Sequence, residues 1–234
     1  MEGWTMNDPG DATASDGPRL GPGERLSDFV DVCVGVAGAD GGAVVVSSPR
    51  HPDTRRVLHT TDSSAERIAD LLYLHGADVD FVSSDRAVGR TIVVGDRRDG
   101  ARWPLLIDDL VAADVGWVRV LPLGAVDAPL GCVQLHRRSV RSGPSPAGTE
   151  VLIEHLVRVI GPVVAGDAAL ATVDGAEDGD TDLTSVAIGI LVARHAVAVD
   201  VASAMLRAGA VARAHSSVAE AQRIIATLHG LEEP

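Results

Sequence analysis

The sequence contains few aromatic residues and few cysteines. Three Trp, two Phe and one Tyr are spread over 234 residues, so most of the core volume must come from Val, Leu, Ile and Ala. The two cysteines, Cys33 and Cys132, stand far apart, and each is next to valine. A metal pair or a redox couple would use local spacing such as CxxC, so we expect two buried free thiols in a reducing compartment.

The chain also lacks a basic surplus and a long apolar run. Lys and Arg number 20 against 33 Asp and Glu, a formal net charge of −13. An acidic surface of this kind repels nucleic acid over most of its area. No stretch approaches the length of a membrane span, and the N-terminal residues lack the basic-then-apolar order of a signal peptide. We therefore expect a soluble, cytoplasmic protein with no membrane partner.

Signatures of catalysis are absent as well. The sequence holds no P-loop, no nucleotide-binding fingerprint and no Ser/His/Asp order of the kind found in hydrolases. His59, His75 and His136 fall in separate predicted elements and form no recognisable metal set. We expect a protein that is not an enzyme, with no catalytic residue and no metal site, and the sequence assigns no cofactor.

The periodicity that is present predicts an α+β domain over residues 24–173. Before it, residues 1–23 are rich in Gly, Pro, Asp and Ser and are expected to be a disordered lead. Helical spacing is found at 24–39, 63–76, 105–116 and 147–173, the last being interrupted or ended near Gly161 and Pro162, and strand patterns are found at 41–48, 55–61, 91–96, 117–124 and 131–138. This order is typical of helices packed on one antiparallel sheet.

The long closing helix carries a broad apolar stripe. Its members are Val151, Leu152, His155, Leu156, Val159, Ile160, Val163 and Val164. The stripe is wide enough for both the sheet and a partner helix. Packing within the domain and a parallel homodimer are both compatible with this pattern.

An acidic segment separates this domain from the C-terminal residues. Residues 174–181 hold nothing that can enter a core and are expected to be a linker. Three short, alanine-rich helical patterns follow over residues 182–230. Ser217 and Glu220 fit the S-x-x-E capping box at the start of the third helix. A unit this small is expected to dock or dimerise.

The C-terminal pattern resembles a known family. The stretch "AIGILVARHAVAVDVASAMLRAGAVARAHSSVAEAQRII" is similar to an ANTAR domain, with Ala187 and Gly189 before "ILVARH", then Asp200, Ala202 and "MLR", and finally Ala221 before "II". The resemblance implies a small all-α three-helix unit that binds RNA and relieves transcription termination in bacterial signalling proteins. Ala187, Gly189, Ala202, Ala204 and Ala210 are interpreted as small residues that let the helices approach closely.

The preceding domain resembles a second family. The stretch "ARWPLLIDDLVAADVGWVRVLPLGAVDAPLGCVQLHRR" is similar to the second half of the GAF sensor domains that often precede ANTAR units in actinobacteria. The resemblance extends over residues 24–165 and implies a GAF-like antiparallel sheet with flanking helices. It also implies a pocket between the sheet and its covering loops, where GAF domains commonly bind a small molecule, a tetrapyrrole or nothing. Trp103, Asp78 and His75 are the candidate residues of that pocket.

Together the resemblances imply an RNA-binding antitermination regulator. Between Thr181 and His229, four Arg against three acids give 4 − 3 = +1, on a chain of net charge −13. An arginine side chain can donate paired hydrogen bonds to a phosphate group and can stack on the unpaired bases of hairpin loops. The candidate RNA contacts are Arg194, Arg207, Arg213, His215 and Arg223. Charge alone favours solvated helix faces for these residues, and the resemblance is what favours RNA.

The pattern departs from the ANTAR family at two positions. Ile188 stands where the family commonly has lysine, and Ser203 where it often has an aromatic residue. These departures, together with the acidity of the chain, favour an alternative function. The chain would then be a signalling or protein-interaction module whose ANTAR unit serves dimerisation and no longer binds RNA.

Overall fold

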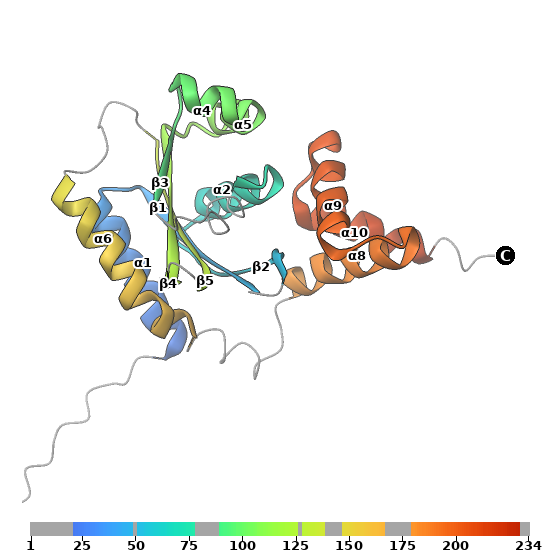
Figure 1. Ribbon diagram of the computed structural model, residues 1–234, viewed down its shortest axis with the longest axis horizontal. Helices are drawn as coiled ribbons and strands as arrows, with labels where there is room; N and C mark the ends of the chain where they lie inside the picture. Colours follow the sequence, from blue (N-terminus) through green and yellow to red (C-terminus); the bar gives the residue numbers. More distant parts are fainter. Residues whose placement is uncertain are drawn as a thin grey trace, which may run out of the picture.

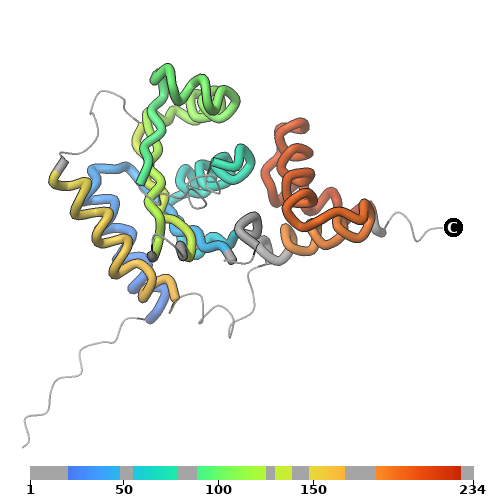
Figure 2. The backbone as a smooth tube through the Cα atoms, in the orientation of Figure 1, coloured from blue at the N-terminus to red at the C-terminus, as the bar shows by residue number. Residues whose placement is uncertain are grey.

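The computed structural model describes residues 21–48, 51–77, 89–125, 128–138, 147–166 and 179–229. These form two parts, a sheet domain (21–166) and a C-terminal helical unit (179–229), which lie side by side in Figures 1 and 2. Most of the lead predicted at 1–23 lies outside the described residues. The first helix begins at Pro22, two positions before the expected start at Glu24, because proline is favoured in the first turn of a helix.

The sheet domain is built on one antiparallel sheet of five strands. The strands are β1 (Gly41–Ser48), β2 (His51–Thr60), β3 (Arg90–Val93), β4 (Trp117–Ala125) and β5 (Ala128–Arg137). Their order is β2-β1-β5-β4-β3, and every neighbouring pair is antiparallel. The prediction of a mixed helix and antiparallel-sheet fold is thereby confirmed.

Helices α1 (Pro22–Ala37) and α6 (Ala147–Val159) cover one face of the sheet (Figure 1). The core residues of α1 recur at helical spacing: Leu26, Phe29, Val30, Cys33 and Ala37. Gly38 ends α1 in a left-handed conformation with φ of 60°. Burial raises the pKa of the Cys33 thiol to about 12, so it stays protonated and acts as a small apolar core residue, as predicted.

Helix α6 turns different residues to the core from those in the predicted stripe. Ile153 and Val157 are buried against α1 and the sheet, whereas the sequence interpretation did not select them. Six members of the stripe are exposed: Val151, Leu152, His155, Val159, Ile160 and Val163. The helix is therefore apolar on two faces, and a stripe drawn through the outer face misses the inner one. A turn at Ile160 precedes a further helical segment at 161–166.

Helices α2 (Ser63–Leu74), α4 (Arg97–Arg102) and α5 (Pro104–Ala112) lie on the other face (Figure 1). The short α4 was not predicted from the sequence. Asp96 caps it by accepting from the backbone N–H groups of Arg98 and Asp99. The buried Asp99 in turn accepts from the Val93 N–H, which ties α4 to the end of β3.

The C-terminal helical unit consists of α8 (Gly179–His195), α9 (Val199–Arg213) and α10 (Ser217–His229). Helix α8 begins inside the segment predicted as a linker, where two aspartates in its first turns favour a helix N-terminus. The shared core is Ala187, Ile188, Leu191, Ala202, Leu206, Ala221 and Ile224, joined by Tyr73 of α2. Gly189 and Ala204 are exposed, so their interpretation as close-packing residues is wrong.

Among the described residues, no single helix combines the length and hydropathy of a membrane span; α8 and α9 meet that test only as a pair bent by 111°.

Candidate nucleic-acid interface

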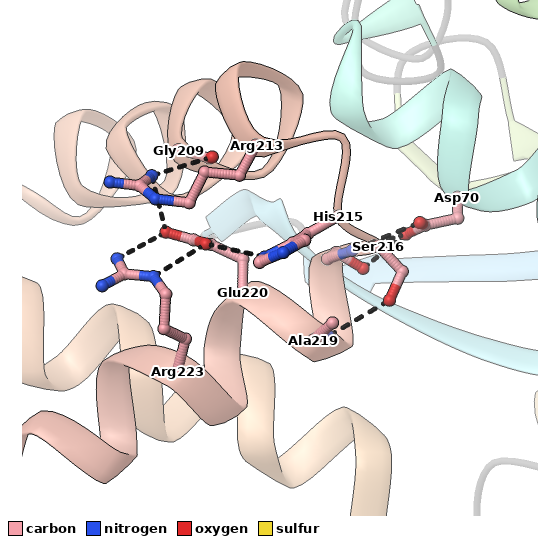
Figure 3. A network of polar contacts seen from close by, with 9 residues as sticks. Asp70, Gly209, Arg213, His215, Ser216, Ala219, Glu220 and Arg223 are labelled. Atoms are coloured by element: carbon pink, nitrogen blue, oxygen red, sulfur yellow. Dashed lines mark hydrogen bonds and ion pairs between the residues drawn. The ribbon is translucent and has the colours of Figure 1, made fainter.

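A buried carboxylate organises the basic side chains of the helical unit. The Glu220 side chain in α10 is 2% exposed. It accepts from Arg223 at 2.6 Å and 3.0 Å and from Arg213 at 3.3 Å, while His215 lies 3.5 Å away (Figure 3). The two arginine side chains remain 40% and 47% exposed. Glu220 therefore fixes one edge of each guanidinium group and leaves the rest open to a partner.

The backbone around Glu220 makes room for this arrangement. A Cβ atom at Gly209 in α9 would lie 2.6 Å from Glu220 Oε1 and 3.2 Å from Arg213 Nη1. Arg213 also donates to the Gly209 carbonyl at 2.9 Å. Gly209, and not Gly189, is therefore the glycine whose missing side chain lets α9 and α10 approach.

The start of α10 differs from the predicted capping box. Ser216 is the residue that caps the helix, because its hydroxyl accepts from the Ala219 N–H at 3.1 Å (Figure 3). The Ser217 hydroxyl instead donates to Asp70 of α2. Glu220 turns to the arginines, since two guanidinium groups are stronger partners for a carboxylate than one backbone N–H.

The cluster shifts the pKa values of its members. The Arg223 hydrogen bond, with the charges of Arg223 and Arg213, lowers the pKa of Glu220. The same hydrogen bond raises the pKa of Arg223. Both shifts favour the charged pair, so the arrangement persists at neutral pH.

A hollow of about 370 Å³ lies beside this cluster. Its apolar floor includes Leu191, Met205 and Ile224, and Arg194, Arg213 and Arg223 lie at its rim. Arg194 is held by a 3.0 Å hydrogen bond from its Nη2 to Thr227 Oγ1. Three positive groups around one buried carboxylate give the hollow a net positive charge.

The structure thus brings together three of the five residues predicted to contact RNA. Arg194, Arg213 and Arg223 share the hollow, and His215 lies against Glu220 behind it. Arg207 points elsewhere. Its guanidinium lies 5.5 Å from the centre of the Tyr73 ring and donates to Ser203 at 3.2 Å. Sequence reasoning gave Glu220 the wrong role; the signal it overlooked was that Glu220 is the only acid between Arg207 and Arg223.

The two departures from the ANTAR pattern are both buried. Ile188 is 4% exposed and belongs to the core of the helical unit. Ser203 is fully buried, and its hydroxyl lies 3.3 Å from the Tyr73 hydroxyl. Neither residue lies at the rim of the hollow. The departures therefore affect the core and the contact with α2, and leave the positive rim unchanged.

Of the three candidate pocket residues of the sheet domain, the structure describes His75 and Trp103. Asp78 lies outside the described residues. The His75 side chain is 8% exposed and pairs with Asp109 at 2.7 Å. Trp103 joins α4 to α5, packs against the core between these helices and the sheet, and lies 5.5 Å from the Arg102 guanidinium. Within the described ranges, no group of three or more His, Cys, Asp and Glu side chains could hold a metal ion.

Comparisons with known proteins are sparse. No protein-family model and no curated protein matches the chain. A domain assigned to a two-component sensor histidine kinase from Sinorhizobium meliloti 1021 is similar over 64% of this chain and 95% of its own, with 15% identity and a TM-score of 0.42. The photoproduct state of GAF3 from Slr1393 of Synechocystis sp. PCC6803 is similar over 62% and 94%, with 16% identity and a TM-score of 0.44. Scores this low do not establish a shared fold.

Proposed function

We propose that the chain is an RNA-binding transcription antitermination regulator and not an enzyme. Its ANTAR-like helical unit binds structured RNA, and its GAF-like sheet domain gates that binding in response to a signal. The observation that carries this proposal is the hollow with an apolar floor and a rim of Arg194, Arg213 and Arg223. We assign no ligand or cofactor to the sheet domain.

The hollow suits an unpaired base of a hairpin loop. Single-stranded loops are recognised by splaying bases onto apolar or planar side chains while cations hold the backbone. Arginine supplies both a planar stacking surface and a fork for phosphate oxygens. Glu220 orients two of the three guanidinium groups before RNA arrives, which lowers the entropy cost of binding.

The test is selection from a pool of structured RNAs with the purified full-length protein, at low and at physiological salt. We expect retention of hairpins that survives physiological salt. Arg194→Gln should weaken binding and reduce the slope of log K against log salt by about 0.7, because one phosphate contact is lost. Arg97→Gln, at an exposed arginine of α4, is the matched control and should change neither quantity. A folded protein that retains no RNA at either salt would overturn the proposal.

We further propose that the regulator is a homodimer joined through α6. Helix α6 and the helical segment 161–166 that follows it expose apolar side chains, with Val151 70%, Val159 54% and Val163 64% exposed. Large contiguous apolar patches on a surface mark interaction sites. A double variant Val159→Glu with Val163→Glu should convert dimer to monomer in light scattering. Val111→Glu on α5, at a valine 58% exposed, should leave the dimer intact.

The second candidate function is a signalling or protein-interaction module without RNA binding. The same apolar face of α6 and the net charge of −13 favour it. A folded dimer that binds no RNA in the selection above would support this candidate and direct the search to protein partners.

A further inference from the structure

The C-terminal helical unit contacts the sheet domain at α2 and the edge strand β2 (Figure 1). The carboxylate of Asp70 in α2 accepts from the Ser217 N–H at 3.2 Å and 3.3 Å, and also from the Ser217 hydroxyl. Arg55 of β2 holds Asp70 in place through a 3.1 Å ion pair. A side chain of the sheet domain therefore binds the first residue of α10 (Figure 3).

Tyr73 is the second element of this contact. It belongs to α2 by sequence, but it packs with the core of the helical unit and is 1% exposed. Its hydroxyl lies 3.3 Å from the buried Ser203 hydroxyl, and the Arg55 guanidinium lies 4.3 Å from the centre of its ring. The helical unit thus completes its core with a residue of the sheet domain.

Arg207 is engaged at the same place. Its guanidinium lies 5.5 Å from the Tyr73 ring and donates to Ser203, so it faces α2 while the other three arginines line the hollow. Arg207 also lines a groove of about 470 Å³ together with Leu74 and His75, so in this docked state α2 borders the approach to its side chain. The sheet domain is mildly acidic, because residues 21–166 hold 15 Arg and no Lys against 19 Asp and Glu, and 15 − 19 = −4.

The contact combines hydrogen bonds with one buried aromatic ring. Two grooves border it, one of about 540 Å³ that includes Arg67 and Thr184 and one of about 470 Å³ that includes His75 and Val211. Apart from the Tyr73 ring, the direct contacts described above are hydrogen bonds. Small, polar contacts between domains permit relative motion, whereas large apolar ones do not.

We propose that this docking is autoinhibitory. Helix α2 covers the Arg207 side of the helical unit, and RNA engages Arg207 only after the unit has left α2. The rim of Arg194, Arg213 and Arg223 remains open in both states, so docking weakens RNA binding without abolishing it. This inference rests on the proposed RNA binding and identifies the contact through which the sheet domain regulates it.

The test is a reversible cross-link in the full-length chain. Asp70→Cys with Ser217→Cys replaces the central contact with two thiols, while Cys33 and Cys132 are buried and shielded from a mild oxidant. The oxidised protein is locked in the docked state and the reduced protein is released. For a hairpin RNA chosen by selection, we expect the oxidised form to bind about tenfold more weakly, because the competent state is removed. Its salt slope should be smaller by about 0.7, the contribution of one arginine.

A further substitution separates this mechanism from a general loss of structure. Arg207→Gln, added to the cross-linking pair, should weaken binding by the reduced protein and leave the oxidised protein unchanged. If the cross-linking pair impairs folding, Asp70→Ala serves as the released form, because it removes the carboxylate that binds Ser217 and leaves Tyr73 in place. It should bind RNA more tightly than the parent chain. Asp108→Ala on the exposed face of α5 is its control and should bind like the parent.

The outcomes distinguish the two proposals. Equal binding by the oxidised and reduced forms, with Arg207→Gln without effect in either, would overturn autoinhibition and leave RNA binding standing. Failure of the folded pair to cross-link would overturn the docked arrangement. Absence of RNA binding in every folded form, including Asp70→Ala, would overturn the proposed function and with it this inference.

Discussion

The sheet domain and the C-terminal helical unit differ in how their hydrophobic cores are built. Among the described residues, the sheet domain has clusters of 14 and 13 buried residues, one on each face of its sheet. The helical unit has one cluster of eight, and one of those eight, Tyr73, comes from α2. The larger domain can therefore be stable by itself, whereas the smaller unit depends on its neighbour for part of its core.

The two parts also use charged residues differently. In the sheet domain, Arg119 of β4 is 7% exposed and pairs with Glu150 and Glu154 of α6, which fastens the helix to the sheet. In the helical unit the carboxylate is the buried member and the arginines stay partly exposed. The first arrangement buries the positive charge, and the second leaves it partly exposed to solvent. Similar ion pairs thus serve packing in one part and, under the proposed function, RNA recognition in the other.

Deleting core volume should give the largest difference between the parts. Leu206→Ala in α9 and Leu110→Ala in α5 each truncate a fully buried leucine, at a cost of about 3 kcal/mol. The small core of the helical unit cannot absorb this loss, so we expect Leu206→Ala to unfold α8, α9 and α10 alone. Leu110→Ala should lower the melting temperature and leave all three helices folded.

Hydrogen exchange read by mass spectrometry checks this prediction peptide by peptide. Fast exchange confined to residues 179–229 in Leu206→Ala is the expected pattern. If both variants lost protection across the whole chain, the two parts would form one cooperative unit and the comparison would fail.

A pair of glycine substitutions should have smaller effects of opposite sign. Gly209→Ala places a Cβ atom 2.6 Å from Glu220 Oε1, and two arginines hold that carboxylate in place. The substitution should therefore lower the free energy of unfolding by about 2 kcal/mol. At Gly189 a Cβ atom meets nothing within 4 Å, so Gly189→Ala should stabilise the helical unit by about 0.7 kcal/mol. Urea unfolding followed by circular dichroism measures both. Equal changes would show that Gly209 has no role in the Glu220 cluster.

Acid should weaken the sheet domain by a still smaller amount. Burial of His136 in β5 lowers its pKa below the ordinary 6.5, against the opposing attraction of Asp62 and Asp40 and with a small contribution from Arg138. The unfolded chain then binds a proton at a higher pH than the folded chain does. The contribution of neutral His136 to the free energy of unfolding is fully present above pH 6.5. It falls as the pH drops towards the lowered pKa, by at most about 1.4 kcal/mol per pH unit.

Thermal melts between pH 7.5 and pH 5 measure this slope. His136→Gln cannot titrate, so its slope should be flatter over the same range, whatever its absolute stability. A parent chain and a variant with the same slope would show that His136 does not control this dependence.

Much of the fold follows from local patterns in the sequence. In α1, the buried Leu26, Val30 and Cys33 recur at helical spacing. In β4 and β5, successive residues alternate between the core clusters on the two faces of the sheet. Both patterns are set by residues close together in the sequence. The apolar stripe of α6 gave the wrong face because that helix is apolar on two sides. Periodicity alone cannot say which side meets the core.

The candidate site was less accessible to sequence reasoning. The arginines could be selected by their residue type, but their grouping depends on α8, α9 and α10 meeting at one place. The role of Glu220 depends on Gly209 and Arg213, which lie in another helix. The insertion of Tyr73 into the helical unit joins residues 130 positions apart, a contact that no local pattern encodes.

The most direct test of the account is a methyl NMR titration with RNA. The sequence has three methionines, Met1, Met6 and Met205, and Met205 lies in the hollow with 37% of its surface exposed. With ¹³C-labelled methionine methyl groups, and Met205→Leu to assign the signal, a selected hairpin RNA should shift the Met205 resonance and leave the other two unchanged. If saturating RNA left the Met205 resonance unmoved, the hollow would not be the RNA site and the central claim would be contradicted.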